Sequence, residues 1–275
     1  MHRKMQKGHW MKIEILVTTM FAQDFSKVEE MNLYNVDVLL ANQTDECGCW
    51  EKDFPERGVH ARMVCTNTRG AGLNRNVALS YATGDIIVFA DDDMRFSDDF
   101  AQLVQQEFAA HPEADGIKFS CRSTNPRRFL ADKTNSAFCR ARVWNLLSGG
   151  IPALALRREK FCKKDLFFPT SIGPGCKYSN GEDSIFLKTL LDSKLKIYIS
   201  PILAAYIRQE NSCWFHGYTE DYFITAGYVY ARLYGRKAHI AALRRAWKMR
   251  GNEEVPYRFS EVLTLLRRGI REYEK

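Results

Sequence analysis

Residues 68–94 read TRGAGLNRNVALSYATGDIIVFADDDM, and the surrounding chain is best interpreted outward from them. A glycine-rich start leads into a helical pattern over 70–82, which Gly84 ends. Four large apolar residues at 86–89 then predict a strand, which is followed directly by three aspartates. Fully apolar strands are typical of parallel sheets that are covered on both faces. The stretch therefore predicts one helix and one strand of an α/β sheet.

Strand-like and helix-like segments alternate before and just after this stretch, an order that predicts an α/β domain with a mostly parallel sheet. The second half is less regular, with a polar, loop-like segment at 121–137, a helix at 182–192 and a strand at 196–200. After Tyr218 the pattern is helical to the end, with a break at 251–256. In the first half we predict strands at 13–19, 36–41 and 60–65 and helices at 24–34 and 97–110, with Ser97 as the N-cap of the last.

The composition is that of an ordinary globular protein. Of the 275 residues, 45% are hydrophobic and 27% are charged, which excludes a disordered or low-complexity chain. The sequence has no apolar run approaching the roughly 18 residues that cross a bilayer, and its basic N-terminus lacks the apolar stretch of a secretory signal. We therefore expect a cytoplasmic protein with reduced cysteines, whose one close pair, Cys47 and Cys49, lacks zinc-site spacing.

The net charge of +7 is concentrated at the C-terminal end. Residues 231–275 contain 12 Lys and Arg against 5 acidic residues, whereas the remainder contains 28 of each sign. A balanced body lacks the basic face that nucleic-acid binding requires, so we expect no nucleic-acid partner. The tail has helical spacing at 237–249 and 258–274. It therefore predicts helices that pack on the domain, contact an anionic membrane surface, or dock on a partner enzyme.

The three aspartates at the end of the apolar strand are the sharpest local feature. Ligands bind open α/β sheets at the carboxyl ends of their strands. Asp91 and Asp93 are two residues apart, so extended backbone directs them to the same side. Carboxylate oxygens suit Mg2+ or Mn2+, and such a metal bridges to a diphosphate. The alternative is a solvated loop or a helix cap without a ligand.

Two further segments contain residue types that are suited to ligand binding or catalysis. Gly70 and Gly72 allow close backbone approach at a helix N-terminus, where phosphate is favoured, and Arg75 is suited to clamp a diphosphate. Further along, Glu182 and Asp183 begin a helix after a glycine-rich turn, and a carboxylate there is suited to act as a general base. Both segments also have structural interpretations: a glycine-initiated helix with polar surface residues, and acids that are favoured by the helix dipole.

Taken together, these segments resemble family 2 of the glycosyltransferases, whose nucleotide-diphospho-sugar transferase fold, GT-A, is a Rossmann-like, mostly parallel sheet flanked by helices. The resemblance covers roughly 12–235, and its last two blocks are similar to bacterial polysaccharide-biosynthesis members. It implies an N-terminal extension at 1–11, a nucleotide-sugar-binding half at 12–95, an acceptor-binding half at 96–235, and a basic helical extension at 236–275. The matching blocks are ILVTTM, VDVLLANQTDE, residues 68–94, GPGCKYSNGEDSIFLKTLL and NSCWFHGYTEDYF.

The resemblance implies an inverting, metal-dependent transfer from a nucleotide-diphospho-sugar to a hydroxyl of a glycan or lipid-linked sugar. Asp183 matches the base that deprotonates the acceptor, with Glu182 supporting it, and Asp91 and Asp93 match the ligands of Mn2+ or Mg2+. The resemblance implies a UDP-sugar, but Asn42 and Gln43 stand near the place where the family usually has an acidic residue that reads uracil. This departure leaves GDP- and dTDP-sugars open, since an amide also hydrogen-bonds a base edge. The implied donor-binding residues are Thr18, Thr19, Asn42, Asp45, Gly70, Arg75, Asp91 and Asp92.

Two later aromatic residues and the competing functions complete the expectations. Trp214 is a candidate acceptor platform, because sugars stack on aromatic faces, or a core residue. His216 is either a late metal ligand or an ordinary histidine. A sugar nucleotidylyltransferase is disfavoured because residues 15–25 lack a glycine-rich, basic phosphate loop. A non-catalytic nucleotide-sugar-binding partner of another transferase stays as the second alternative.

Overall fold

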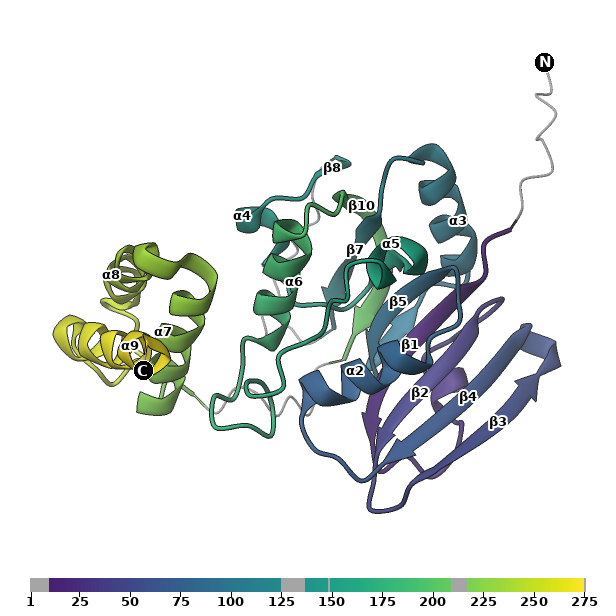
Figure 1. Ribbon diagram of the computed structural model, residues 1–275, viewed down its shortest axis with the longest axis horizontal. Coiled ribbons are helices and arrows are strands. Elements are labelled where there is room, and N and C mark those ends of the chain that lie inside the picture. Colours follow the sequence, from purple (N-terminus) through teal and green to yellow (C-terminus); the bar gives the residue numbers. More distant parts are fainter. Residues whose placement is uncertain (1–9, 125–136, 148, 209–216, 275) are drawn as a thin grey trace.

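The computed structural model describes residues 10–124, 137–147, 149–208 and 217–274. Within them, one sheet of ten strands runs through the molecule in the order β3-β4-β2-β1-β5-β9-β7-β10-β6, with β8 paired to β10 (Figure 1). The strands are β1 (Ile13–Met20), β2 (Asp37–Gln43), β3 (Gly48–Phe54), β4 (Val59–Thr66), β5 (Ile86–Asp91), β6 (Met94–Phe96), β7 (Gly116–Ser123), β8 (Cys139–Arg140), β9 (Leu154–Arg157) and β10 (Ile197–Ile207).

The sheet is mixed. Strands β4, β2, β1 and β5 are mutually parallel, as the sequence predicts, and β7 is parallel to β10. Between these two groups β9 pairs antiparallel with both β5 and β7, while β3 and β6 are antiparallel edge strands. The parallel half places the carboxyl ends of β1 and β5 side by side, with Thr18 in register with Asp91.

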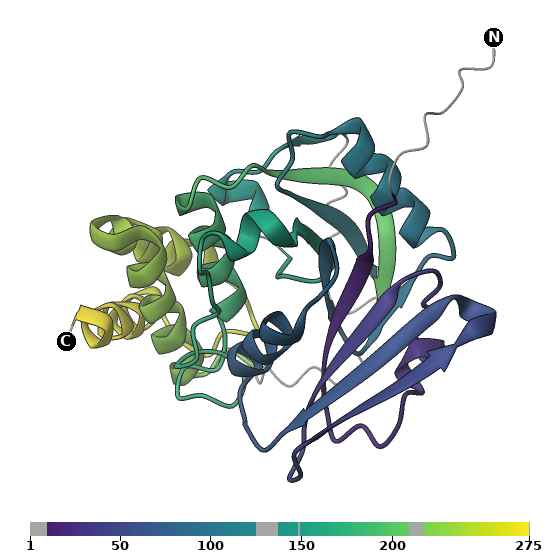
Figure 2. The same ribbon diagram turned by 45° about the vertical axis from the view of Figure 1, so that its right-hand side comes forward.

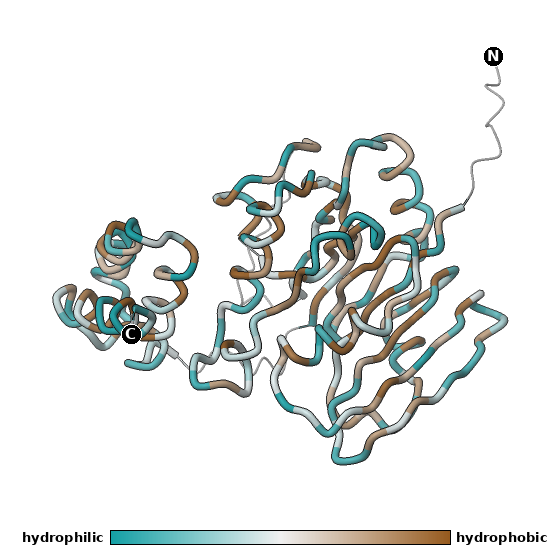
Figure 3. The backbone as a smooth tube through the Cα atoms, viewed as in Figure 1, coloured by the Kyte–Doolittle hydropathy of each residue, from teal (hydrophilic) through white to brown (hydrophobic). Residues whose placement is uncertain are grey.

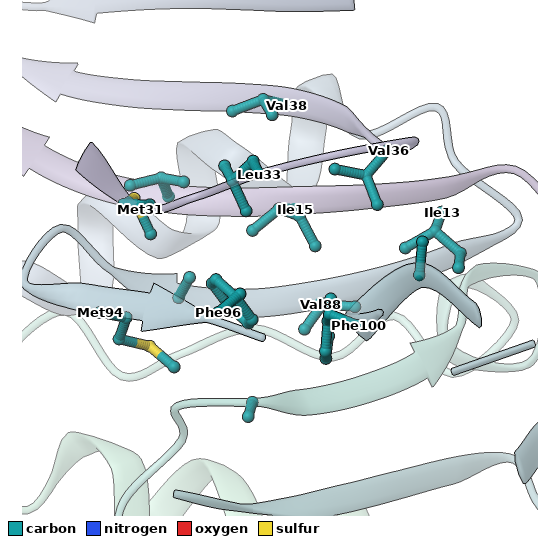
Figure 4. Packing of buried hydrophobic residues seen from close by; sticks show 14 of the residues in the cluster. Ile13, Ile15, Met31, Leu33, Val36, Val38, Val88, Met94, Phe96 and Phe100 are labelled. Carbon is teal, nitrogen blue, oxygen red and sulfur yellow. The ribbon is translucent and has the colours of Figure 1, made fainter. Parts of the chain in front are cut away.

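Helices cover both faces of the sheet, because the central strands present apolar side chains on each face. Ile13, Ile15 and Val17 face α1 and α3, as Figure 4 shows for part of this core, and Leu16 faces α2, α5 and α6. Figure 3 shows hydrophobic residues along these inner strands. The helices on the sheet are α1 (Lys27–Glu30), α2 (Ala71–Tyr81), α3 (Phe100–Ala110), α4 (Val143–Leu146), α5 (Arg158–Cys162) and α6 (Glu182–Asp192), with a 3-10 turn at Pro55–Arg57.

The last three helices form a cluster of their own at the end of the molecule (Figures 1 and 2). α7 (Glu220–Tyr234) and α9 (Phe259–Glu274) cross so closely that a Cβ on Gly227 would lie 2.0 Å from the Leu266 carbonyl oxygen. A Cβ on Gly269 would lie 1.9 Å from the Ile224 carbonyl oxygen. α8 (Ala238–Met249) follows a 3-10 turn at Gly235–Lys237 and packs on both. Within the described residues, no helix has the length and apolar character needed to span a bilayer.

The structure differs from the predicted elements in five details. The helix predicted at 24–34 is confined to α1, because Asn32 (φ 57°) takes a left-handed conformation. The N-cap of α3 is Asp99 and not Ser97. The strand predicted at 196–200 continues to Ile207, and β3 was not predicted because it is an edge strand whose residues are largely exposed. Part of the predicted polar loop, at 121–123, belongs to β7.

Candidate active site

Polar side chains gather where β1 and β5 end. The hydroxyl of Thr18 lies 3.4 Å from Oδ1 of Asp91 and donates to it, and the Thr19 hydroxyl donates to Oδ2 of Asp92 at 2.6 Å. The glycine-rich start of α2 lies at the same edge, since the Asn74 amide donates to the Thr19 carbonyl at 3.2 Å. The sheet register thus brings together residues that the sequence separates by more than fifty positions.

Arg75 connects this edge to the start of α6. Its Nη2 donates to Oδ1 of Asp91 at 3.1 Å, and its Nη1 donates to Oδ1 of Asp183 at 2.7 Å and to Oε1 of Glu182 at 3.1 Å. The guanidinium is buried and lies over the ring of Phe168, 5.4 Å from its centroid. The predicted diphosphate clamp and the predicted general base are therefore in direct contact across the site.

Burial and charge together set the protonation of this cluster. Burial would lower the pKa of Arg75, but the surrounding carboxylates, Asp183 first, raise it above its ordinary value. Burial and the neighbouring Asp183 charge raise the pKa of Glu182 to about 7, although Arg75 opposes the shift. Burial also raises the pKa of Asp183, and Arg75 and the Ile151 amide act in the opposite direction. Burial thus raises the pKa of both acids and strengthens their affinity for a proton, which is a property of groups that act as general bases.

A buried lysine that the sequence reasoning missed supports Asp183 from the opposite side. Lys118 of β7 donates through Nζ to the Pro152 carbonyl at 2.7 Å, and the amide of the preceding residue, Ile151, donates to Oδ2 of Asp183 at 3.1 Å. A Cβ on Gly150 would lie 2.9 Å from that same oxygen. One signal was available: Lys118 is the lone charged residue within the apolar strand sequence GIKFS.

The glycine-rich turn before α6 approaches the protein's own side chains closely. Gly173 (φ 114°) leaves room for Glu182, whose carboxyl carbon would lie 2.9 Å from an added Cβ. Gly181 (φ 111°) caps α6, and its added Cβ would lie 2.4 Å from Cγ2 of Val229 in α7. These glycines thus let the turn pack between the site and the helical cluster, which fixes the start of α6.

The predicted donor-binding residues differ in their surroundings. Asn42 is buried, and its amide group exchanges hydrogen bonds of 3.0 and 2.8 Å with the backbone of Ala22. Asp45 is exposed and accepts from Nη2 of Arg69 at 2.5 Å. Gly70 (φ 113°) is the N-cap of α2. Asn42 therefore holds the loop after β1 in place. Asp45 and Arg69 form an exposed ion pair, and Arg69 was not predicted as a site residue from the sequence.

The donor chemistry of the aspartates fits Mg2+ or Mn2+. Asp91 is partly exposed, and its Oδ1 is engaged by Arg75 and Thr18. Within the described ranges, no group of three or more His, Cys, Asp or Glu side chains forms a ready-made metal cage. Mg2+ is commonly bound by one or two carboxylates together with substrate phosphates, and Asp91 and Asp93 suit that arrangement. Trp214 and His216 lie outside the described residues.

The mixed sheet, the strand-end aspartates and the acid pair on α6 define the nucleotide-diphospho-sugar transferase fold, GT-A. The family model described as glycosyl transferase family 2 matches residues 26–166, and the chain belongs to this family. It is a glycosyltransferase. Comparison with curated protein sequences found no match.

Solved structures share the fold at low sequence identity. S. aureus TarS 1–349 in complex with UDP-GlcNAc is 15% identical, with a TM-score of 0.63 and coverage of 96% of this chain and 89% of that one. The same TarS fragment in complex with UDP is 16% identical, with a TM-score of 0.60 and the same coverage. The mannosyltransferase PcManGT from Pyrobaculum calidifontis, in complex with GDP-Man and Mn2+, is 17% identical, with a TM-score of 0.50 and coverage of 96% and 70%.

Proposed function

We propose that the protein is an inverting, metal-dependent glycosyltransferase that moves a sugar from a nucleotide-diphospho-sugar, a UDP-sugar first, to a hydroxyl of a glycan or lipid-linked acceptor. The observation that carries the proposal is the contact of Arg75 with Asp91 on one side and with Glu182 and Asp183 on the other. One buried cation thereby joins the strand end expected to hold the donor to the helix start expected to meet the acceptor.

Asp183 is the proposed general base. Arg75 and the Ile151 amide each engage one of its oxygens, so its carboxylate is held in a fixed orientation. A pKa raised by burial strengthens its affinity for the proton of an attacking hydroxyl, provided that the group is ionised when the acceptor binds. The attacking oxygen then forms the new bond to the anomeric carbon from the face opposite the departing nucleoside diphosphate. Glu182 positions Arg75 and, with it, the base.

The donor side is assigned to the ends of β1 and β5 and the start of α2. Thr18, Thr19, Asp91 and Asp92 are proposed to contact the nucleotide, with Gly70 giving access to the backbone at the helix N-terminus. Asp91 and Asp93 would hold Mn2+ or Mg2+, which supplies Lewis-acid stabilisation of the leaving diphosphate when bound. The UDP-GlcNAc bound by TarS supports a UDP-sugar, while the GDP-Man bound by PcManGT keeps GDP in the test.

A thermal-shift panel of UDP, GDP, dTDP and CDP, each with and without Mn2+, tests the donor side. A nucleotide at about 100 times its dissociation constant stabilises the protein by about 2.7 kcal/mol. We expect one nucleotide to raise the melting temperature in the presence of metal, and the shift to be lost in Asp93→Ala. The exposed Asp99, at the start of α3, provides the matched control, since Asp99→Ala should keep the shift. A panel without any shift would remove the main support for the donor assignment.

Turnover of the donor identified in this way tests the base. We expect Asp183→Asn to lower turnover by about 10²- to 10⁴-fold while the nucleotide-induced thermal shift is retained. Asp192→Asn, at the exposed end of the same helix, should leave turnover unchanged. NMR of the product checks the inverted anomeric configuration. Binding without transfer by the wild type to any acceptor screened would favour the non-catalytic nucleotide-sugar-binding alternative.

The acceptor platform at Trp214 and the peripheral membrane contact of the basic tail also remain predictions. Acceptor screening with Trp214→Ala addresses the first. Sedimentation with anionic vesicles at low salt addresses the second.

A further inference from the structure

Helix α8 is apolar on two opposite faces. Ala238, Ala242, Ala246 and Met249 pack inside the helical cluster. A second apolar stripe, at the spacing of one helix face, points away from the cluster: Ile240 is 61% exposed, Leu243 49% and Trp247 61%. A surface helix normally presents polar residues on its outer face, so this exposed stripe is unusual for a helix that has already buried its other apolar side.

A basic groove begins beside this stripe. His239, the residue before Ile240, lines an open cavity of about 450 Å3 together with Thr264, Arg267 and Arg271 of α9. Neither arginine forms an ion pair with any of the residues that the structure describes. Two arginines one helical turn apart, with a hydroxyl and an imidazole beside them, provide the donors that recognise a phosphate group.

The sequence around the groove is also positively charged. Residues 222–252 contain seven Lys and Arg and no Asp or Glu. Arg244 and Lys248 are exposed on α8, and the guanidinium of Arg250 lies over the Trp247 ring, 4.3 Å from its centroid. A tryptophan paired with arginine suits a water–membrane interface, because the ring is amphipathic and the cation reaches the headgroups.

We propose that the groove of His239, Thr264, Arg267 and Arg271, together with the exposed stripe of Ile240, Leu243 and Trp247, is a docking face for anionic phospholipid membranes. The groove takes headgroup phosphates, and the stripe enters the acyl boundary. A soluble phosphate compound would use the groove but would leave the apolar stripe in water. The stripe therefore favours a lipid surface over a free phosphate.

The docking face is connected to the candidate active site through α9. Glu272, next to Arg271, accepts hydrogen bonds from the Tyr178 hydroxyl at 2.8 Å and from Nζ of Lys177 at 3.0 Å. The Tyr178 ring also stacks on Tyr228 of α7, with centroids 4.0 Å apart. These contacts tie the turn that leads into Glu182 to α9, which carries the arginines of the face, and to α7, on which α9 packs. The proposal goes beyond the transferase activity and is tested without a sugar donor.

Co-sedimentation of the full chain with vesicles tests the proposal. We expect binding to vesicles of phosphatidylcholine containing about one third phosphatidylglycerol, weak binding to phosphatidylcholine alone, and loss of binding at high salt. The double variant Arg267→Gln/Arg271→Gln should lower the partition coefficient about 30-fold, from the contribution of a basic residue near an anionic surface. The control, Lys160→Gln/Lys164→Gln on the distant face at α5, removes the same charge and should change partition by less than about threefold.

The apolar stripe has its own readout. Tryptophan fluorescence should shift to shorter wavelength when anionic vesicles are added, and Trp247→Phe should abolish the shift while circular dichroism confirms the fold. Equal losses in the two double variants would overturn the assignment to this face, because only total charge would then matter. Stabilisation by inorganic phosphate that requires Arg267 and Arg271, without vesicle binding, would assign the groove to a soluble phosphate and overturn the membrane proposal.

Discussion

Nη1 of Arg75 lies 2.7 Å from Oδ1 of Asp183, although 107 residues separate them along the chain. The same guanidinium contacts Glu182 and Asp91, so one buried cation faces three carboxylates. Were all of them ionised, this group of four would have a net charge of −2 in a largely buried position, which is costly. Proton uptake by Glu182 removes part of this excess negative charge. Burial and the Asp183 charge therefore raise its pKa.

Removing Arg75 should destabilise the protein strongly. Arg75→Gln leaves Glu182 and Asp183 buried without their cation, and loss of one partner of a buried pair costs about 3–5 kcal/mol. The free energy of unfolding in urea measures this loss. Arg69→Gln is the matched control, because its pair with the exposed Asp45 is worth at most about 1 kcal/mol. Similar losses in the two variants would show that the buried cluster is not under electrostatic stress.

The stability of the protein should depend on the protonation of Glu182. Burial raises its folded-state pKa to about 7, above the unfolded value, so the native state holds an additional proton between about pH 4.5 and 7. This contribution is fully present at the acid end of that window and is lost as the pH rises through 7. We expect wild type to lose stability relative to Glu182→Gln between pH 5 and 8, roughly the range set by the two pKa values.

Urea unfolding of both proteins across that range is the measurement. Titrating groups far from the cluster are common to both proteins, so the difference between the two curves reports Glu182 together with the neighbouring Asp183, whose charge acts on it. A difference that stays constant with pH, or that grows in favour of wild type as the pH rises, would contradict the assigned direction.

Lys118 should position the segment that holds the base. Lys118→Met fills a similar volume but leaves the Pro152 carbonyl without its buried donor, which costs about 1–3 kcal/mol. Since Ile151 donates to Asp183, we also expect turnover to fall, by up to about 10²-fold, with little change in nucleotide affinity. Lys196→Met, on an exposed residue just before β10, is the control. Parallel losses in nucleotide binding and turnover would point to general unfolding instead.

The crossing of α7 and α9 should tolerate nothing larger than glycine. Gly269→Ala would place its Cβ 1.9 Å from the Ile224 carbonyl oxygen, so the helices must separate. Overpacking of this kind costs about 1–3 kcal/mol, and thermal or urea unfolding should detect it. Ser260→Ala, on the exposed side of α9, should stay within about 0.5 kcal/mol of wild type. Wild-type stability in Gly269→Ala would mean that the crossing is looser than the structure shows.

Elements with a strong local signal were predicted closely. The apolar run of β5, the glycine before α2 and the acid start of α6 place these elements within about a residue of the structure. The antiparallel entry of β9 between β5 and β7 was not predicted, because an apolar strand has the same pattern in either direction. β3 was missed since an exposed edge strand has no apolar periodicity.

The site shows the same division. Asp91, Arg75, Glu182 and Asp183 were each predicted by residue type and local context, and the structure brings them together. Asn42 stays a predicted donor-binding residue, and its side-chain amide exchanges hydrogen bonds with the Ala22 backbone, a contact that sequence spacing does not reveal. Lys118 was missed because its role depends on a carbonyl 34 residues away.

The sequence by itself determined the family, the parallel half of the sheet and the residue types of the site, because these follow from short-range periodicity and from chemistry confined to a few neighbouring positions. The tertiary structure decided which of those groups contact the same cation, which glycines are required by close packing, and which face of α8 is left exposed. These properties depend on burial and on contacts between distant segments, and burial is a property of the packed molecule and not of any one segment.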